Sequence, residues 1–123
     1  MARQNITSGN PFEPVFGYSR AVRIGNQIHV AGTTADGADA YEQSKNALTI
    51  IARALVEAGA SFEHVVRTVI YVTDMNAHMD GVTRAHGEVF GNIRPASTLV
   101  AVTALVRPEL VVEIEAYAIL PDD

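Results

Sequence analysis

The stretch LVVEIEAYAIL, residues 110–120, decides which fold the rest of the chain has to complete. Its side chains alternate in character, which predicts a β-strand with two unlike faces. One face carries small or branched apolar residues: Val112, Ile114, Ala116 and Ala118. The other face carries Val111, Glu113, Glu115 and Tyr117. The first face suits packing against helices, and the strand is too apolar to leave the second face bare, so we expect another subunit to cover it.

Two further strands and a helix are expected before the middle of the chain. A hairpin is predicted over residues 18–34, where apolar residues flank Gly25-Asn26, a pair that supplies the positive φ of a tight turn. Apolar residues then recur at helical spacing from Tyr41 to Ala58. Asp39 followed by Glu42 resembles a capping box, which predicts that the helix begins there.

The second half of the chain repeats this alternation of strand and helix. Residues 65–74 are dense in β-branched residues and predict a central strand. A second helix, capped by Asp74 or Asn76, is expected to run to Phe90, and residues 97–106 predict another strand. The resulting order, ββαβαββ, indicates an α+β sheet with two helices on one face.

Length and composition indicate one domain over residues 1–123, of which the polar residues 1–16 form an N-terminal arm or loop. The net charge is −5 and no run of Lys or Arg occurs, so a nucleic acid partner is not expected. The chain has no cysteine, which excludes disulfides and thiolate sites and agrees with a reducing compartment. No signal-peptide core and no apolar run near the roughly 20 residues of a membrane span occurs, so we expect a cytoplasmic protein without a membrane partner.

Several polar side chains are candidates for chemistry, each with a structural alternative. Glu113 could activate water as a general base, or it could lie on a solvated strand face. Ser97 and Thr98 could be nucleophiles, although hydroxyls at a strand start more often bond to the backbone. The four histidines lack metal-ligand spacing, and no phosphate-binding glycine motif occurs, so neither a metal nor a cofactor is expected.

Arg94 precedes Pro95, which predicts an extended backbone and a fixed cation. Its guanidinium can hold a carboxylate through two hydrogen bonds, or it can pair with one of the 14 acidic residues of the chain. The residues alone leave these two interpretations open.

Nearly the whole chain after residue 15 resembles the Rid (reactive intermediate deaminase) family, also called YjgF or L-PSP. The segments that carry the resemblance are GYSRAVRIGNQIHVAG (17–32), QSKNALTIIARALVEAGA (43–60), VVRTVIYVTDMN (65–76), HGEVFGNIRPAST (86–98) and LVVEIEAYAI (110–119). The resemblance implies a ferredoxin-like or chorismate-mutase-like fold, and a homotrimer with a central barrel and small-molecule clefts between subunits. Active members hydrolyse imines or enamines made from amino acids to ketoacids and ammonia.

The resemblance also implies roles for individual residues. Tyr18, Gly32 and Phe90 would line the cleft, and Glu113 would position water. The arginine that grips the substrate carboxylate should directly follow Pro95-Ala96, where this chain has Ser97. A serine brings one hydroxyl and no charge, so a carboxylate would be held weakly.

Three functions remain open from the sequence. The first is a Rid-like protein that binds or hydrolyses an unidentified small molecule, with Glu113 as the catalytic residue. The change to serine at position 97 counts against imine deaminase activity. The second is a true deaminase in which Arg94 replaces the missing arginine, Arg107 being a weaker candidate. The third is a non-catalytic binding or chaperone-like trimer. The expected ligand is an imine or a ketoacid, and its predicted contacts are Tyr18, Gly32, Phe90, Arg94, Ser97 and Thr98.

Overall fold

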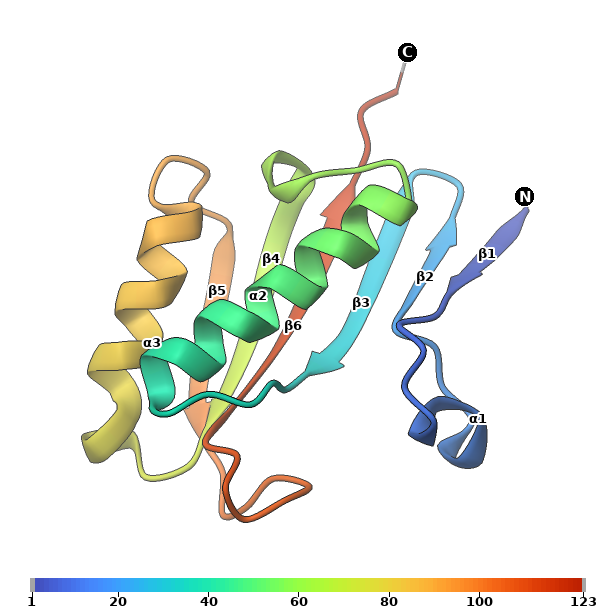
Figure 1. The fold of residues 1–123 in the computed structure, drawn as a ribbon. Coiled ribbons are helices and arrows are strands. Elements are labelled where there is room, and N and C mark those ends of the chain that lie inside the picture. Colours follow the sequence, from blue (N-terminus) through green and yellow to red (C-terminus); the bar gives the residue numbers. More distant parts are fainter. Residues whose placement is uncertain (1, 123) are drawn as a thin grey trace.

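The computed structural model describes residues 2–122, and its strands form one mixed sheet behind two long helices (Figure 1). The strands are β1 (Arg3–Ile6), β2 (Ala21–Ile24), β3 (Gln27–Thr33), β4 (Val65–Val72), β5 (Ala96–Ala101) and β6 (Val112–Ile119). The helices are α1 (Phe12–Phe16), α2 (Ala40–Glu57) and α3 (Met75–Phe90), with a short 3₁₀ turn at Phe62–His64. The sheet order is β1-β2-β3-β6-β4-β5, and only β4 and β5 run parallel. The predicted α+β class is confirmed.

Strand β6 lies in the middle of the sheet and has the two unlike faces that its sequence predicts. Val112, Ile114, Ala116 and Ala118 are each at most 1% exposed. They face α2 and α3, which cover one side of the sheet, while the other side carries no helix from residues 2–122 (Figure 1). Burying the alternate apolar residues of β6 therefore leaves its glutamates and Tyr117 on the open side.

The predicted ends of the elements are confirmed at three places. The Asp39 side chain accepts a hydrogen bond from Glu42 N at the start of α2, at 2.9 Å. Asp74 caps α3 by accepting from Ala77 N at 3.3 Å. Between β2 and β3 the two-residue turn has its positive φ, 60°, at Gly25. Each cap satisfies a backbone N–H that the first helical turn would leave without a partner.

Two segments differ from the prediction. The expected arm, residues 1–16, contains strand β1, which adds to the sheet by pairing with β2 and buries Ile6. It also contains helix α1. The strand expected over residues 97–106 ends at Ala101, because its partner β4 ends at Val72, the residue opposite Ala101. Past this point β5 has no neighbour to continue the ladder.

Candidate functional site

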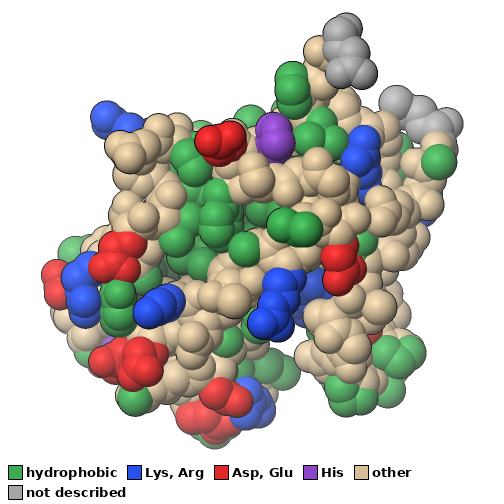
Figure 2. Space-filling model, turned by 45° about the horizontal axis from the view of Figure 1, so that its top comes forward, with side chains coloured by type: hydrophobic (Ala, Val, Ile, Leu, Met, Phe, Trp, Pro, Cys, Tyr) green, Lys and Arg blue, Asp and Glu red, His purple; other side chains and the backbone are tan. Residues whose placement is uncertain are grey.

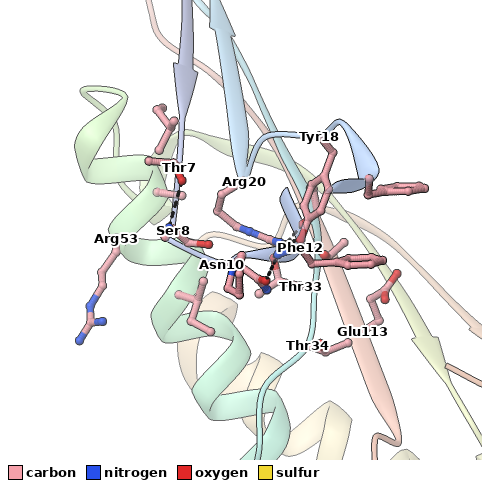
Figure 3. Close-up of a pocket in the computed structure, with 18 of the residues that line it drawn as sticks. Thr7, Ser8, Asn10, Phe12, Tyr18, Arg20, Thr33, Thr34, Arg53 and Glu113 are labelled. Carbon is pink, nitrogen blue, oxygen red and sulfur yellow. Dashed lines mark hydrogen bonds between the residues drawn. The ribbon is translucent and has the colours of Figure 1, made fainter. Parts of the chain in front are cut away.

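A cleft of about 1170 Å³ opens between the N-terminal segment, the ends of β3 and β6, and one side of α2 (Figure 3). Tyr18 precedes β2, Gly32 lies in β3 and Glu113 lies in β6, and all three line this cleft. The pairing of β3 with β6 shifts by one residue between Val30 and Thr33, which is a β-bulge in the segment that contains Gly32. Three of the residues implied by the family resemblance are therefore brought together within one protomer.

Gly32 packs directly against the side chain of Glu113. A β-carbon at position 32 would overlap Glu113 Oε2 and would lie 2.9 Å from Glu113 Cδ. No larger residue fits while the carboxylate holds this place. The absence of a side chain at position 32 is what allows the Glu113 carboxylate to reach the wall of the cleft.

The Glu113 carboxyl holds its proton more tightly than an ordinary glutamate. Burial raises its pKa, and the nearby charge of Glu115 raises it further, while the positive charge of Arg20 acts in the opposite direction. A carboxyl of this kind can exchange a proton with a bound molecule nearer to neutral pH. The geometry thus places an acid or base at the wall of the cleft.

Arg20 is a cleft residue that the sequence analysis missed. It lies immediately before β2, is 5% exposed and lines the cleft between Tyr18 and Thr33 (Figure 3). Its Nη1 donates to Gly32 O at 2.9 Å and to Thr33 Oγ1 at 2.8 Å, and its Nη2 donates to Tyr18 Oη at 2.9 Å. The spacing from Tyr18 was the available signal, because residues two apart in an extended segment share a face.

The N-terminal segment forms one wall of the cleft, and Glu13 holds it in place. The buried carboxylate of Glu13 accepts from Thr7 Oγ1 at 2.8 Å and from both the backbone N–H and the hydroxyl of Ser8. Burial acts to raise the Glu13 pKa, but the hydrogen bonds from Ser8 and Thr7 and the charge of Arg20 outweigh it, so the pKa is lowered. An ionised carboxylate thus closes a loop beside the cleft.

Exposed aromatic rings border this wall. Phe12 is 49% and Phe16 is 72% exposed, and their rings stack with centroids 5.7 Å apart. Phe16 also meets the ring of Tyr18 edge to face, with centroids 5.6 Å apart. Helix α1 therefore presents an aromatic border beside the polar groups of Tyr18 and Arg20.

Ser97 lies on the opposite side of the sheet from Glu113. It is paired across the ladder with Thr68, whose hydroxyl donates to Ser97 Oγ at 2.7 Å and lies 2.9 Å from His86 Nε2. His86 belongs to α3, so this chain of side chains faces the helices. Burial lowers the pKa of the His86 imidazole. The phenylalanine expected to line the cleft, Phe90, is 2% exposed and packs beside His86 in the core instead.

The other predicted contacts also lie outside the cleft. Thr98 accepts a hydrogen bond from Arg67 on the helix-free side of the sheet. Arg94 is exposed and has a φ of 60°, not the extended backbone expected before a proline, because its N–H bonds back to Phe90 O in the turn that ends α3. Arg107 forms ion pairs with Asp36 and Glu109. Neither of these two arginines lines the cleft.

The surface charge is mixed in sign, and the described residues offer neither a metal site nor a membrane-spanning helix. Acidic and basic side chains lie interspersed on the face shown in Figure 2. Among residues 2–122 there is no group of three His, Asp or Glu side chains placed to hold a metal ion. Within the same range, none of the helices has the length and apolar content that a membrane crossing needs.

Comparison with known proteins gives consistent results. The model of the family Endoribonuclease L-PSP matches residues 8–120. The chain is similar to the crystal structure of Rv2704 from Mycobacterium tuberculosis, a member of the YjgF/YER057c/UK114 family, with a TM-score of 0.94 and 50% identity over 97% of this chain and 100% of that one. It is 38% identical to the protein SCO2049 of Streptomyces coelicolor, over 94% of this chain and 92% of the relative.

A relative with a stated activity is the 2-iminobutanoate/2-iminopropanoate deaminase of Mus musculus. It is 32% identical over 112 residues, which cover 83% of this chain and 80% of the mouse protein. The match of the family model over residues 8–120, together with these relatives, identifies the chain as a member of the Rid/YjgF/L-PSP family.

Proposed function

We propose that this protein binds a small organic molecule in the cleft of Tyr18, Gly32 and Glu113, and hydrolyses a C=N bond in it. The observation that carries the proposal is Glu113, a partly buried carboxyl with a raised pKa that is seated against Gly32 in the cleft wall. The activity of the mouse relative supports the same class of substrate, an imine derived from an amino acid.

The reaction follows from the groups in the cleft. The Glu113 carboxylate accepts a proton from water as the water oxygen bonds to the imine carbon, and it passes this proton to the imine nitrogen to give a carbinolamine. Glu113 then takes the proton of the carbinolamine hydroxyl and delivers it to the nitrogen, so that the C–N bond breaks, ammonia leaves and a C=O group forms with the carboxylate regenerated. One imine and one water thus yield one ketone and one ammonia. The Tyr18 hydroxyl, which accepts from Arg20, can donate its own hydrogen to the substrate.

The activity can be tested with 2-aminoacrylate generated in situ. Purified protein is expected to accelerate the release of pyruvate, and Glu113→Gln to lose about 10²- to 10⁴-fold of that acceleration, the range of a general acid–base group. Glu109→Gln is the matched control, because Glu109 is exposed and pairs only with Arg107 among residues 2–122. Absence of acceleration at every protein concentration would refute hydrolysis and leave the non-catalytic binding function.

A small ligand agrees better with the charge of this protein than RNA does, although the family model carries the name of an endoribonuclease. The net charge is −5, and the charges on the face in Figure 2 are of both signs. A polyanion gains most of its affinity from clustered Lys and Arg. Added oligoribonucleotide is therefore expected to remain intact and unbound at physiological salt, as measured by electrophoretic mobility.

We also propose that the protein is a homotrimer whose helix-free sheet faces meet in a central barrel. Support comes from the open side of the sheet, where Glu115 accepts hydrogen bonds from Tyr71 at 3.2 Å and from Tyr117 at 2.9 Å, and where Val100 is 38% exposed. Covering this face would remove apolar surface from water. Light scattering is expected to give about three times the chain mass of 13.2 kDa, and a mass of one chain would refute the trimer.

A further inference from the structure

We infer that Arg20 is the anion-binding group of the cleft and that its ligand is a small molecule bearing a carboxylate. The inference rests on the proposed function only in that both place a small molecule in this cleft. It assigns to Arg20 the recognition of a negative charge beside Tyr18 and Glu113, a role that then does not need an arginine at position 97.

Arg20 carries a buried charge without a counter-ion in contact among the described residues. Arg20 is 5% exposed, yet all of its hydrogen bonds go to neutral acceptors: Gly32 O, Thr33 Oγ1 and Tyr18 Oη. Its Nε is buried and has no hydrogen-bond partner in the part of the chain that the structure describes. Among residues 2–122 no carboxylate forms an ion pair with it. A buried charge is costly unless it is paired, so an anion from solution would be favoured beside it.

Two carboxyls lie near enough to feel the charge of Arg20, but each is held by other groups. The charge of Arg20 reaches both Glu13 and Glu113. Glu13, however, is bound by Thr7 and Ser8, and these bonds keep it in the N-terminal wall. Glu113 is held against Gly32 and favours its protonated form more than an exposed glutamate would. Neither carboxyl therefore neutralises Arg20 in the way that an ion pair would.

The other arginines near the cleft do not face Tyr18 and Glu113. Arg107 is engaged in two ion pairs, and Arg94 lies outside the cleft. Arg53 of α2 does line the cleft, but it is exposed and its guanidinium points away from Tyr18 and Glu113 (Figure 3). Arg20 is fixed by its three bonds, so little side-chain entropy remains to be lost when a ligand binds.

The arrangement gives the ligand an orientation. Arg20 and Tyr18 lie in one part of the cleft and Glu113 lies beside them, toward Thr34 (Figure 3). A small acid with its carboxylate at Arg20 would extend its neighbouring carbon toward Glu113. Ser97 contributes nothing to this geometry within the protomer, since its side chain lies on the helix-bearing face of the sheet.

The test uses pyruvate and its neutral amide, pyruvamide, as a matched pair of probes in equilibrium binding measured by NMR titration. The unmodified protein is expected to bind pyruvate at least about tenfold more tightly than pyruvamide, as a charge-assisted hydrogen bond allows. In Arg20→Gln the two affinities are expected to become equal. Arg53→Gln, which removes the exposed arginine of the same cleft, is expected to keep most of the preference for pyruvate.

Three results would overturn the inference. They are equal or undetectable binding of both probes by the unmodified protein, a retained preference in folded Arg20→Gln, and a preference lost in Arg53→Gln instead. If Arg20→Gln does not fold, Arg20→Lys is measured in its place. Lysine keeps the positive charge but lacks the planar guanidinium that can bind a carboxylate through two hydrogen bonds. Its pyruvate affinity is expected to fall several-fold with pyruvamide unchanged, and an unaltered pyruvate affinity would refute the role of Arg20. Binding through Arg20 without imine hydrolysis would refute only the proposed function.

Discussion

Gly32 and Glu113 occupy complementary space, so that a β-carbon on residue 32 would overlap the Glu113 carboxylate. The two residues come from neighbouring strands, β3 and β6, and meet at the bulge between Val30 and Thr33. The bulge also directs the Gly32 carbonyl to Arg20, at 2.9 Å. One local irregularity in the sheet thus positions both the acid and the cation of the cleft.

Replacing Gly32 is expected to damage the site more than the fold. In Gly32→Ala the new methyl group must displace the end of the Glu113 side chain. The side chain gives way because it is flexible, whereas the backbones of both residues are fixed in the sheet. Turnover of 2-aminoacrylate is expected to fall at least about tenfold, while the free energy of unfolding changes by about 1 kcal/mol or less. Steady-state kinetics and urea unfolding measure the two effects.

The matched control for this substitution is Gly87→Ala. Gly87 lies in α3, and a β-carbon there would meet nothing within 4 Å. Alanine favours a helix over glycine by up to about 1 kcal/mol, so this variant should be as stable as the original or more so, with unchanged turnover. Full activity in Gly32→Ala would show that the Glu113 carboxylate need not occupy its observed place.

The raised pKa of Glu113 predicts a specific dependence of stability on pH. The folded state holds the Glu113 proton more tightly than the unfolded state does, so this group favours folding at low pH. Its contribution is lost as pH rises through the raised pKa. Glu113→Gln removes the ionisation, so its melting temperature should exceed that of the original protein at pH 7 to 8, and the difference should vanish near pH 4. An equally large difference at both pH values would contradict this origin.

The fold could be predicted from the sequence because its signals are local. The alternation in β6, the cap at Asp39 and the turn at Gly25 each depend on neighbouring residues, and the structure confirms all three. The failures have a non-local cause. Strand β1 forms because β2 offers it a free edge, and β5 stops at Ala101 because β4 has ended. Whether a strand has a partner is a property of the assembled sheet.

The site was predicted only in part for a similar reason. Tyr18, Gly32 and Glu113 could be placed together by resemblance to a family, and they do line one cleft. Arg20 was missed although its spacing of two residues from Tyr18 suggested a shared face, because nothing in its local sequence shows that its guanidinium turns inward to three oxygen atoms. Ser97 was predicted to contact the ligand because it directly follows Pro95-Ala96. Its hydroxyl instead accepts a hydrogen bond from Thr68 on the other side of the sheet.

Glu13 predicts that the N-terminal wall is sensitive to a conservative substitution. In Glu13→Gln the amide offers one oxygen where the carboxylate accepts three hydrogen bonds from Thr7 and Ser8, so at least one donor loses its partner. The free energy of unfolding should fall by about 1–3 kcal/mol at pH 7. Because the Glu13 pKa is lowered in the folded state, the difference from the original protein should shrink as pH falls through that pKa.

The measurement for Glu13 is urea unfolding over a range of pH, combined with hydrogen exchange of the backbone in residues 7–17. Faster exchange there, with unchanged exchange in β6, would place the effect in the wall. Glu63→Gln is the control, since Glu63 lies in the 3₁₀ turn away from the cleft. A loss of stability that is equal in the two variants would exclude a special role for the bonds of Glu13.

The hydrogen-bonded side chains of Ser97, Thr68 and His86 predict a dependence of stability on pH near neutrality. Burial lowers the pKa of His86 in the folded state, so the unfolded state binds a proton more tightly and stability falls as pH drops below the ordinary histidine value of 6.5. His86→Gln should flatten this dependence between pH 7 and 5, whereas His78→Gln on the same helix serves as the control.

Thr68→Val removes the shared hydroxyl and leaves His86 Nε2 without its partner, which should cost about 1–3 kcal/mol at pH 7. Ser97→Ala removes an exposed acceptor while the Thr68 hydroxyl keeps its hydrogen bond with His86 Nε2, so it should cost less. Equal losses from the two variants, measured by urea unfolding, would mean that Ser97 rather than His86 is the partner that Thr68 needs.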